Sequence, residues 1–263
     1  MKQIKLYWYN EFANFGDLLS RYILERMLNL EASWSIPKEA QIFSLGSIMR
    51  YVEIGCHNRT TGIRPIIWGT GCIGPIGREF VPKADFRLIR GPLTADMLNL
   101  QKVPYGDPGL ILPKLYQPKS TPISGRIGVL PHISQINAVK QMLGHNPNYH
   151  LISPLNQDFL SVVDEITKCE YLYSSSLHGL ILADAYGIEN TWLSPDGIHP
   201  HTARFKFYDY ALSIGRVLGE PVKLDDLASN IASLIKPQIK YNGGIEDCIE
   251  SLENTASVIK SQL

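Results

Sequence analysis

The stretch "YLYSSSLHGLILADAYGI" (residues 171–188) contains the change from a buried strand to a helix that decides the fold. A short apolar run ends at three serines, and apolar residues with helical spacing begin directly after them. In open α/β sheets, ligands bind beyond the carboxyl ends of the strands, where helix N-termini present unpaired N–H groups. The junction therefore indicates an anion-binding site, with simple helix capping as the alternative.

Two other stretches repeat this strand, junction and helix pattern. In "FRLIRGPLTADMLNL" (86–100) a strand leads to Gly91 and Pro92, and proline suits the first turn of a helix. In "IKLYWYNEFANFGDLL" (4–19) a buried strand precedes a helix predicted over 17–30, with Asp17 as its N-cap. Polar residues and glycines at the three junctions are candidates for binding: Asn14, Gly16, Asp17, Arg90, Gly91, Thr94, Ser174, Ser175, Ser176, His178 and Gly179.

The rest of the chain continues the alternation of strands and helices. Strands are expected within 40–47, 64–71, 103–112, 126–132, 149–154 and 190–195, and helices over 134–144, 156–168, 223–236 and 245–262. Such alternation predicts an α/β fold with two Rossmann-like domains, whose parallel sheets face a cleft.

A proline-rich stretch, "PKLYQPKSTPISG" (113–125), is the predicted linker between the two domains. We therefore expect an N-terminal domain over 1–118 and a C-terminal domain over 119–240. The last segment, 241–263, is predicted to be a helix that packs back on the first domain.

The composition excludes several classes of protein. Lys and Arg (25) balance Asp and Glu (25), so no overall positive field attracts nucleic acid. The four cysteines form no CxxC pair, which favours buried thiols over disulfides or a zinc knuckle. No apolar run approaches the ~18 residues of a membrane span, and the N-terminus lacks the apolar core of a signal peptide. These features predict a cytoplasmic protein.

Two motifs are weaker than they first look. "GTGCIG" (69–74) matches the dinucleotide fingerprint GxGxxG, but prolines follow where a helix should begin. We expect a tight turn that allows close approach of other groups.

His199 and His201 have a metal-chelating spacing near Asp196, but the sequence offers no evident third ligand, so no metal site is predicted. Arg204 and Lys206 alternate with Phe205 and Phe207, which predicts a strand-like basic edge.

Taken together, these segments resemble the polysaccharide pyruvyl transferase family from about residue 10 to about residue 215. The resemblance rests on "NFGD" (14–17), "GS" (46–47), "WGTG" (68–71), "RGPLT" (90–94), "GDP" (106–108), "LPH" (130–132), "SSSLHGLILADAYGI" (174–188) and "FKFYDY" (205–210). The last two are most similar to the exopolysaccharide branch, whose members form pyruvate ketals in succinoglycan and xanthan synthesis. Many members have Arg where this chain has Ser176, so another cation, Arg204 or Lys206, is expected to replace it.

The resemblance implies a fold like the GT-B glycosyltransferases and phosphoenolpyruvate as the donor, with no other cofactor. The product would be a cyclic pyruvate ketal bridging two hydroxyls of a sugar in a bacterial surface polysaccharide or exopolysaccharide repeat unit. A lipid-linked acceptor further implies peripheral contact of the cytoplasmic protein with the inner membrane face.

The chemistry that the resemblance implies assigns roles to residues. His178 is expected to act as acid and base, because both protonation states of an imidazole are accessible near neutral pH. Arg90 is expected to bind the donor's carboxylate or phosphate, and His132 to help bind the donor or transfer a proton. The remaining assignments are donor contacts for Ser174, Ser175, Ser176, Gly179, Thr94, Arg204 and Lys206, and acceptor contacts for Asn14, Asp17, Trp68 and Tyr208.

Two alternatives stay open on the sequence. A GT-B-type glycosyltransferase would use the same cleft with a nucleotide sugar, and the absence of an acidic metal motif weakens only one class of these enzymes. A sugar-binding or scaffolding protein without activity is the other alternative, and the serine at position 176 is its support. The choice of donor discriminates among the three.

Overall fold

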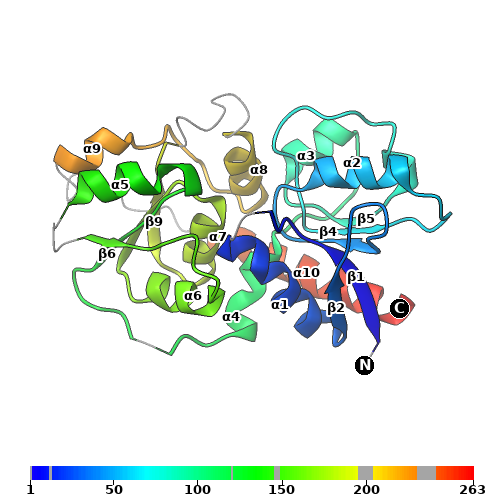
Figure 1. Cartoon of the computed structure of the whole chain (residues 1–263), viewed down its shortest axis with the longest axis horizontal. Helices are drawn as coiled ribbons and strands as arrows, with labels where there is room; N and C mark the ends of the chain where they lie inside the picture. The colour runs from blue at the N-terminus through cyan, green and yellow to red at the C-terminus, as the bar shows by residue number, and fades with distance from the viewer. Residues whose placement is uncertain (1, 12–13, 120, 145–148, 195–203, 230–240) are drawn as a thin grey trace.

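The structure is a computed structural model of the chain, and it describes residues 2–11, 14–119, 121–144, 149–194, 204–229 and 241–263. Two fully parallel sheets form its two halves, one on each side of the view in Figure 1. The first sheet has five strands in the order β2-β1-β3-β4-β5, and the second has four in the order β7-β6-β8-β9. The predicted α/β fold with two parallel sheets is confirmed, and it is consistent with two Rossmann-like domains.

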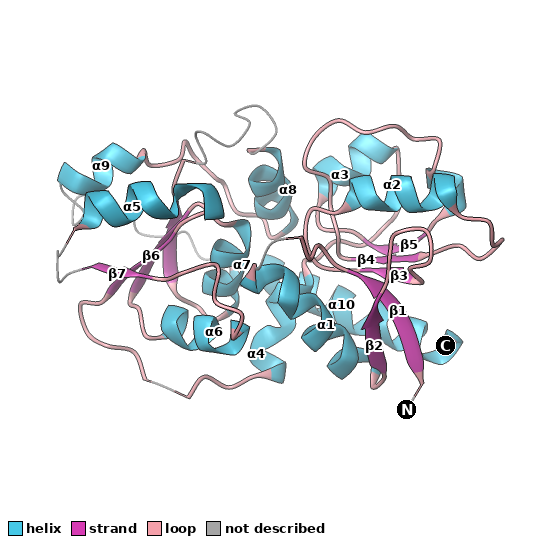
Figure 2. Cartoon of the chain, viewed as in Figure 1, coloured by secondary structure: helices cyan, strands magenta, loops and turns pink. Residues whose placement is uncertain are grey.

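The first sheet and its helices occupy residues 3–98. Its elements are β1 (Gln3–Tyr7), α1 (Phe15–Leu28), β2 (Glu31–Trp34), β3 (Ile42–Phe43), α2 (Met49–Asn58), β4 (Ile66–Trp68), η1 (Val81–Lys83), β5 (Asp85–Leu88) and α3 (Pro92–Leu98). Short elements η2 (Pro108–Ile111) and α4 (Leu112–Leu115) then lead toward the second half. Figure 2 shows helices on both sides of this sheet.

The second sheet lies within residues 127–192. Its elements are β6 (Ile127–Leu130), η3 (Ile133–Gln135), α5 (Ile136–Leu143), β7 (Tyr149–Leu151), α6 (Phe159–Thr167), β8 (Tyr171–Ser174), α7 (Leu177–Ala185) and β9 (Glu189–Trp192). The helices α8 (Phe205–Ser213), α9 (Leu224–Ser229) and α10 (Asn242–Gln262) complete the described chain.

Several sequence predictions need correction. Asn14, not Asp17, is the N-cap of α1, because the Asn14 side chain accepts a hydrogen bond from the Gly16 N–H. The predicted strand within 103–112 is reduced to one bridge between Ile89 and Tyr105, followed by helical turns. The predicted basic strand edge at Arg204 and Lys206 is instead the start of helix α8.

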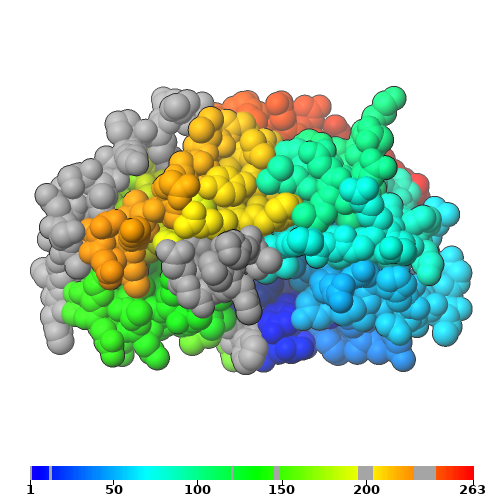
Figure 3. Space-filling model, turned by 90° about the horizontal axis from the view of Figure 1, so that it is seen from above, coloured from blue at the N-terminus to red at the C-terminus, as the bar shows by residue number. Residues whose placement is uncertain are grey.

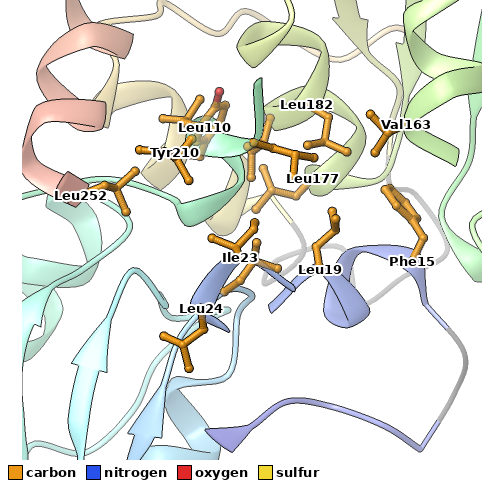
Figure 4. Packing of buried hydrophobic residues seen from close by; sticks show 14 of the residues in the cluster. Phe15, Leu19, Ile23, Leu24, Leu110, Val163, Leu177, Leu182, Tyr210 and Leu252 are labelled. Carbon is orange, nitrogen blue, oxygen red and sulfur yellow. The ribbon is translucent and has the colours of Figure 1, made fainter. Parts of the chain in front are cut away.

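One apolar core joins the two halves. It includes Phe15, Leu19 and Ile23 of α1, Val163 of α6, Leu177 and Leu182 of α7, Tyr210 of α8 and Leu252 of α10, several of which converge in Figure 4. Burial of apolar surface is the main stabilising contribution to a fold, so this shared core holds the sheets together. The predicted domain limits at 118 and 240 stay a prediction.

Helix α10 lies against the first half of the chain. The Trp68 indole N–H donates to the Thr255 hydroxyl at 2.9 Å, and Arg87 donates to the Gln262 side chain at 2.9 Å. At the other end of the helix, the Tyr241 hydroxyl bonds to Asp184 of α7. The helix therefore connects the two halves. Within the described residues, no helix combines the length and apolar character needed to cross a bilayer.

Candidate functional site

A pocket of about 350 Å³ lies between the two sheets, and we call it the central pocket. Its lining residues come from both halves: Tyr9, Asn14, Asp17, Ser47, Ile48, Arg50, Tyr51, Ile73, His132, Ser176, Leu177, His178 and Lys206. Several follow the carboxyl ends of strands, which is where open α/β folds bind ligands. The structure therefore brings together five predicted site residues that also carry ionisable or hydroxyl chemistry: Asp17, His132, Ser176, His178 and Lys206.

His178 lies in the first turn of α7, at the junction between β8 and α7. Its Nε2 atom is buried and has no hydrogen-bond partner among the described residues. The ring packs edge-on against Phe15 and lies directly over Gly16, where a Cβ atom would stand 1.8 Å from Nδ1. Burial, with smaller effects from Lys206 and Arg90, lowers the pKa of His178 to about 3. His178 is therefore a neutral imidazole whose buried Nε2 has no hydrogen-bond partner among the described residues.

His132 follows β6, the strand that pairs with β8 in the second sheet. Its backbone N–H donates to the Ser175 hydroxyl at 2.8 Å, and its Nδ1 accepts from the Ser134 N–H at 3.3 Å. Because Nδ1 is an acceptor in that bond, the neutral ring carries its proton on Nε2. Burial and the charge of Lys206 lower the pKa of His132 to about 4.

Lys206 and Asp17 face the pocket from different halves. Burial is the largest cause that lowers the pKa of Lys206 to about 8, followed by Arg90, while Asp17 opposes the change. Burial also raises the pKa of Asp17 to about 7, opposed by Lys206 and by a hydrogen bond with Asn14. Both groups can therefore change protonation state near neutral pH, as groups that transfer protons must.

Arg90 does not line the central pocket. Its side chain is fully buried, and its guanidinium forms an ion pair with Asp209 at 2.9 Å. The same guanidinium donates to the Ser47 hydroxyl and to the Cys72 carbonyl, both at 2.6 Å. Gly71 lies flat against it, at a distance that a Cβ atom would not allow. The structure thus places Arg90 behind the pocket wall rather than in contact with the cavity.

The Arg90–Asp209 pair also places α8. Asp209 accepts from both the backbone N–H and the hydroxyl of Thr94, at 2.9 and 2.8 Å, so the start of α3 and the middle of α8 are tied together. Lys206 lies one helical turn before Asp209, and residues three apart share a face of a helix. In Figure 3 the yellow atoms around α8 meet the blue-green atoms of the first half.

Other predicted site residues lie outside the cavity. The Ser174 hydroxyl donates to the Leu130 and Ser176 carbonyls, and Gly179 packs against it. Trp68 is fully buried, with its N–H paired to Thr255, so it offers no surface to an acceptor. Tyr208 packs edge-on against Trp192. Arg204 forms an ion pair at 2.9 Å with Glu220, whose side chain is exposed.

The sequence analysis missed several lining residues, notably Ser47, Arg50 and Tyr51. Ser47 follows Gly46, which has a left-handed φ of 104°, and the "GS" dipeptide was the one visible signal for it. Arg50 and Tyr51 lie on α2, a helix that the sequence analysis did not identify.

The structure contains no cluster of three or more His, Cys, Asp or Glu that could hold a metal ion, among the residues that it describes. His199, His201 and Asp196 lie outside those residues. All four cysteines are free and buried, as the sequence predicted.

The sequence of the chain is similar to known proteins and matches one protein family. It is 23% identical over 241 residues to the uncharacterized protein L143 of Acanthamoeba polyphaga mimivirus, covering 89% of this chain and 82% of that protein. It is 24% identical over 213 residues to the succinoglycan biosynthesis protein ExoV of Rhizobium meliloti (strain 1021), covering 80% of this chain and 64% of ExoV. The polysaccharide pyruvyl transferase family matches residues 14–197, a range that contains every strand of the two sheets except β1, and most residues of the central pocket. The chain therefore belongs to the polysaccharide pyruvyl transferase family.

Proposed function

We propose that this protein transfers pyruvate from phosphoenolpyruvate to two hydroxyls of a saccharide, forming a cyclic ketal and releasing phosphate. The observation that carries the proposal is the convergence of one ammonium, two imidazoles and one carboxyl on a single pocket between the sheets. Membership of the family supports the same reaction.

The donor needs a proton at its methylene carbon and positive charge at its carboxylate and phosphate. Protonation of the methylene makes carbon 2 electrophilic, and a sugar hydroxyl then attacks it and loses its proton. Cleavage of the bond between carbon 2 and the phosphate oxygen follows, and the second hydroxyl closes the ring and loses its own proton. One of the two hydroxyl protons thus replaces the one placed on the methyl group, and the other leaves with the phosphate.

We assign the proton transfer at the methylene to His178. His178 lines the pocket that both halves form, and its Nε2 has no hydrogen-bond partner among the described residues. A bound trianionic donor would raise the pKa of the imidazole toward neutrality. Asp17, with its pKa raised to about 7, is suited to accept a proton from an acceptor hydroxyl. The Nε2–H of His132 would donate a hydrogen bond to the anionic groups of phosphoenolpyruvate.

We assign the binding of the anionic groups of phosphoenolpyruvate to the Lys206 ammonium. The Ser176 hydroxyl would donate a hydrogen bond to the same groups. Lys206 lines the pocket, whereas Arg204 pairs with Glu220, so Lys206 is the better replacement for the arginine that many relatives carry at position 176. Arg90 acts as a positioning residue in this proposal, because it holds Ser47 and docks α8 through Asp209. The acceptor in the cytoplasm would be a saccharide of a surface polysaccharide, presented on a lipid at the inner membrane face.

Thermal denaturation with ligands tests the choice of donor. A ligand at about 100 times its Kd stabilises a protein by about 2.7 kcal/mol, which is a readily measured shift in Tm. We expect stabilisation by phosphoenolpyruvate and none by UDP, GDP or CMP sugars. Stabilisation by a nucleotide sugar alone would instead favour a glycosyltransferase.

A matched pair of variants locates the donor. Lys206→Met removes the ammonium with little change in volume and should weaken phosphoenolpyruvate binding about tenfold to a hundredfold, because a charge-assisted hydrogen bond contributes about 1.5–3 kcal/mol. Arg204→Met removes a cation two residues away and should bind the donor as the parent protein does. Equal effects of the two substitutions would argue against the assignment of Lys206.

A further inference from the structure

A second pocket, of about 470 Å³, lies directly beside the central pocket. We call it the side pocket. It is bounded by residues 8–10 after β1, by the first two turns of α1, and by residues 157–159 at the start of α6. Tyr9 and Asn14 line both pockets, so the two cavities share a wall.

The side pocket differs from the central pocket in its chemistry. Aromatic rings of Trp8, Tyr9 and Phe159 line it together with the side-chain amides of Asn10 and Gln157. Arg21 is the one charged residue among the described residues that line it, and its Nε donates to Glu25 at 2.9 Å. Because the positive charge of Arg21 is paired with Glu25, the side pocket is poorly suited to bind a second anionic group. Aromatic faces and amides are instead suited to the C–H faces and hydroxyls of a neutral sugar.

Two contacts between the halves hold the walls of the side pocket together. The Phe15 N–H donates to the Pro154 carbonyl at 3.1 Å, which ties the segment before α6 to the start of α1. Phe159 packs edge-on against Tyr22 of α1, with ring centroids 5.5 Å apart. Gln157 lies between these two anchor points in the chain and is exposed. The hydrogen bond and the ring contact thus fix the positions of the walls of the side pocket relative to each other.

We propose that the side pocket binds the sugar next to the one that receives pyruvate. The acceptor is then an oligosaccharide, with its reacting sugar at the shared wall of Tyr9 and Asn14 and its neighbouring sugar against Trp8 and Phe159. This inference rests on the proposed function, because the central pocket must hold the donor and the reacting hydroxyls. Beyond the proposed function, the inference specifies that the acceptor has at least two sugars and names the residues that contact the second one.

Acceptor length is tested with methyl glycosides, whose aglycone is too small to fill the side pocket. Phosphate release from phosphoenolpyruvate and ketal formation are measured with methyl glycosides of glucose, galactose and mannose, and with disaccharide methyl glycosides that carry the same terminal sugars. We expect kcat/KM to be at least about tenfold higher for the disaccharide that carries the accepted sugar, which corresponds to one good sugar contact.

Variants then assign the preference to the side pocket. Gln157→Ala and Trp8→Leu should lower kcat/KM for the disaccharide about tenfold more than for the monosaccharide, mainly through KM. Gln101→Ala is the matched control, because Gln101 is an exposed amide that lines neither pocket. Trp8 is partly buried, so Trp8→Leu could disturb folding. Gln157 is exposed, so Gln157→Ala should leave the fold intact and tests the same pocket.

The outcomes separate the two proposals. Turnover with no preference for the disaccharide, or equal losses for both acceptors in the variants, would overturn the side-pocket assignment and leave the proposed function standing. No phosphate release and no ketal with any glycoside in the parent protein would overturn the proposed function, and the inference with it.

Discussion

His178 and His132 are neutral near pH 7 because burial and Lys206 lower both pKa values. Their unfolded-state pKa is near 6.5, so between that pH and about 4 the unfolded chain binds protons that the folded protein excludes. Depressed pKa values of bases therefore cost stability as the pH falls below about 6.5. The cost is at most about 1.4 kcal/mol per pH unit for each histidine.

Removal of one histidine should reduce this dependence on pH. We expect His178→Asn to lose less stability than the parent protein between pH 6.5 and 4.5, as measured by urea denaturation at a series of pH values. His57→Asn serves as the control, because His57 is exposed on α2. An identical pH profile for His178→Asn and the parent protein would mean that His178 is not buried as neutral imidazole.

His178 also carries the largest predicted catalytic effect. His178→Ala should reduce turnover of phosphoenolpyruvate by about 10²–10⁴, the range for loss of a general acid or base. The fold should survive, since no hydrogen bond to Nε2 is lost among the described residues. Circular dichroism together with steady-state phosphate release checks both statements. Near-normal turnover in a folded variant would remove His178 from the mechanism.

At the scale of secondary-structure elements, the contact between α1 and α7 depends on a glycine. The His178 ring lies so close to Gly16 that a Cβ atom would overlap it. Gly16→Ala should therefore displace the imidazole and lower turnover at least about tenfold, while the helix itself gains in propensity. Gly62→Ala is the control, since its Cβ would meet no atom within 4 Å. Turnover equal to that of the control would show that the imidazole position is not critical.

Helix α8 is held by a buried ion pair, and this gives a second test at the same scale. Asp209→Asn leaves Arg90 with an uncompensated buried charge, which typically costs about 3–5 kcal/mol. Glu220→Gln removes an exposed partner of Arg204 and should change stability by no more than about 1 kcal/mol. Chemical denaturation measures both. Similar small losses would mean that the Arg90–Asp209 pair does not hold α8 in place.

The sequence predicted the junctions better than the elements between them. Hydrophobic runs and glycine-proline breaks located β1, β4, β5, β6 and β8, because strands buried in parallel sheets are continuously apolar. Strand β2 was missed because "EASW" is short and mostly exposed. Helix α8 was mistaken for a strand because residues 204–207 alternate between basic and aromatic side chains, which is the period of a strand. The helical spacing of the buried residues Phe207, Tyr210 and Ala211 continues beyond that short run.

The candidate site shows the same division between local and long-range information. His178, Ser176 and His132 were predicted because each follows a strand end. The burial of Arg90 and Trp68 could not be predicted, because their partners Asp209 and Thr255 are more than 100 positions away in the chain. A basic residue at the end of a strand is compatible with binding an anionic ligand and with forming an ion pair inside the protein. The two roles can be told apart only when the partner of the residue is known.

For the whole molecule, the shared core predicts a single unfolding transition. Residues of α1, α7 and α10 pack together across the two halves, and α10 bonds to both. Differential scanning calorimetry should give one peak whose calorimetric and van't Hoff enthalpies agree. Leu177→Ala, which removes a buried side chain of this core, should lower the free energy of unfolding by about 2–5 kcal/mol, and the Tm with it, without splitting the peak. Two resolved peaks would mean that the halves fold independently.

The reaction that we propose for the pocket between the two sheets is the formation of a pyruvate ketal from phosphoenolpyruvate. The most direct test is mass spectrometry of a saccharide acceptor incubated with the protein and phosphoenolpyruvate in D2O. We predict a product heavier by one pyruvyl ketal, with one solvent deuterium in its methyl group and phosphate released in equal amount. An unmodified saccharide under conditions in which phosphoenolpyruvate binds, or a product that carries an added sugar from a nucleotide-sugar donor, would mean that the protein does not catalyse this reaction.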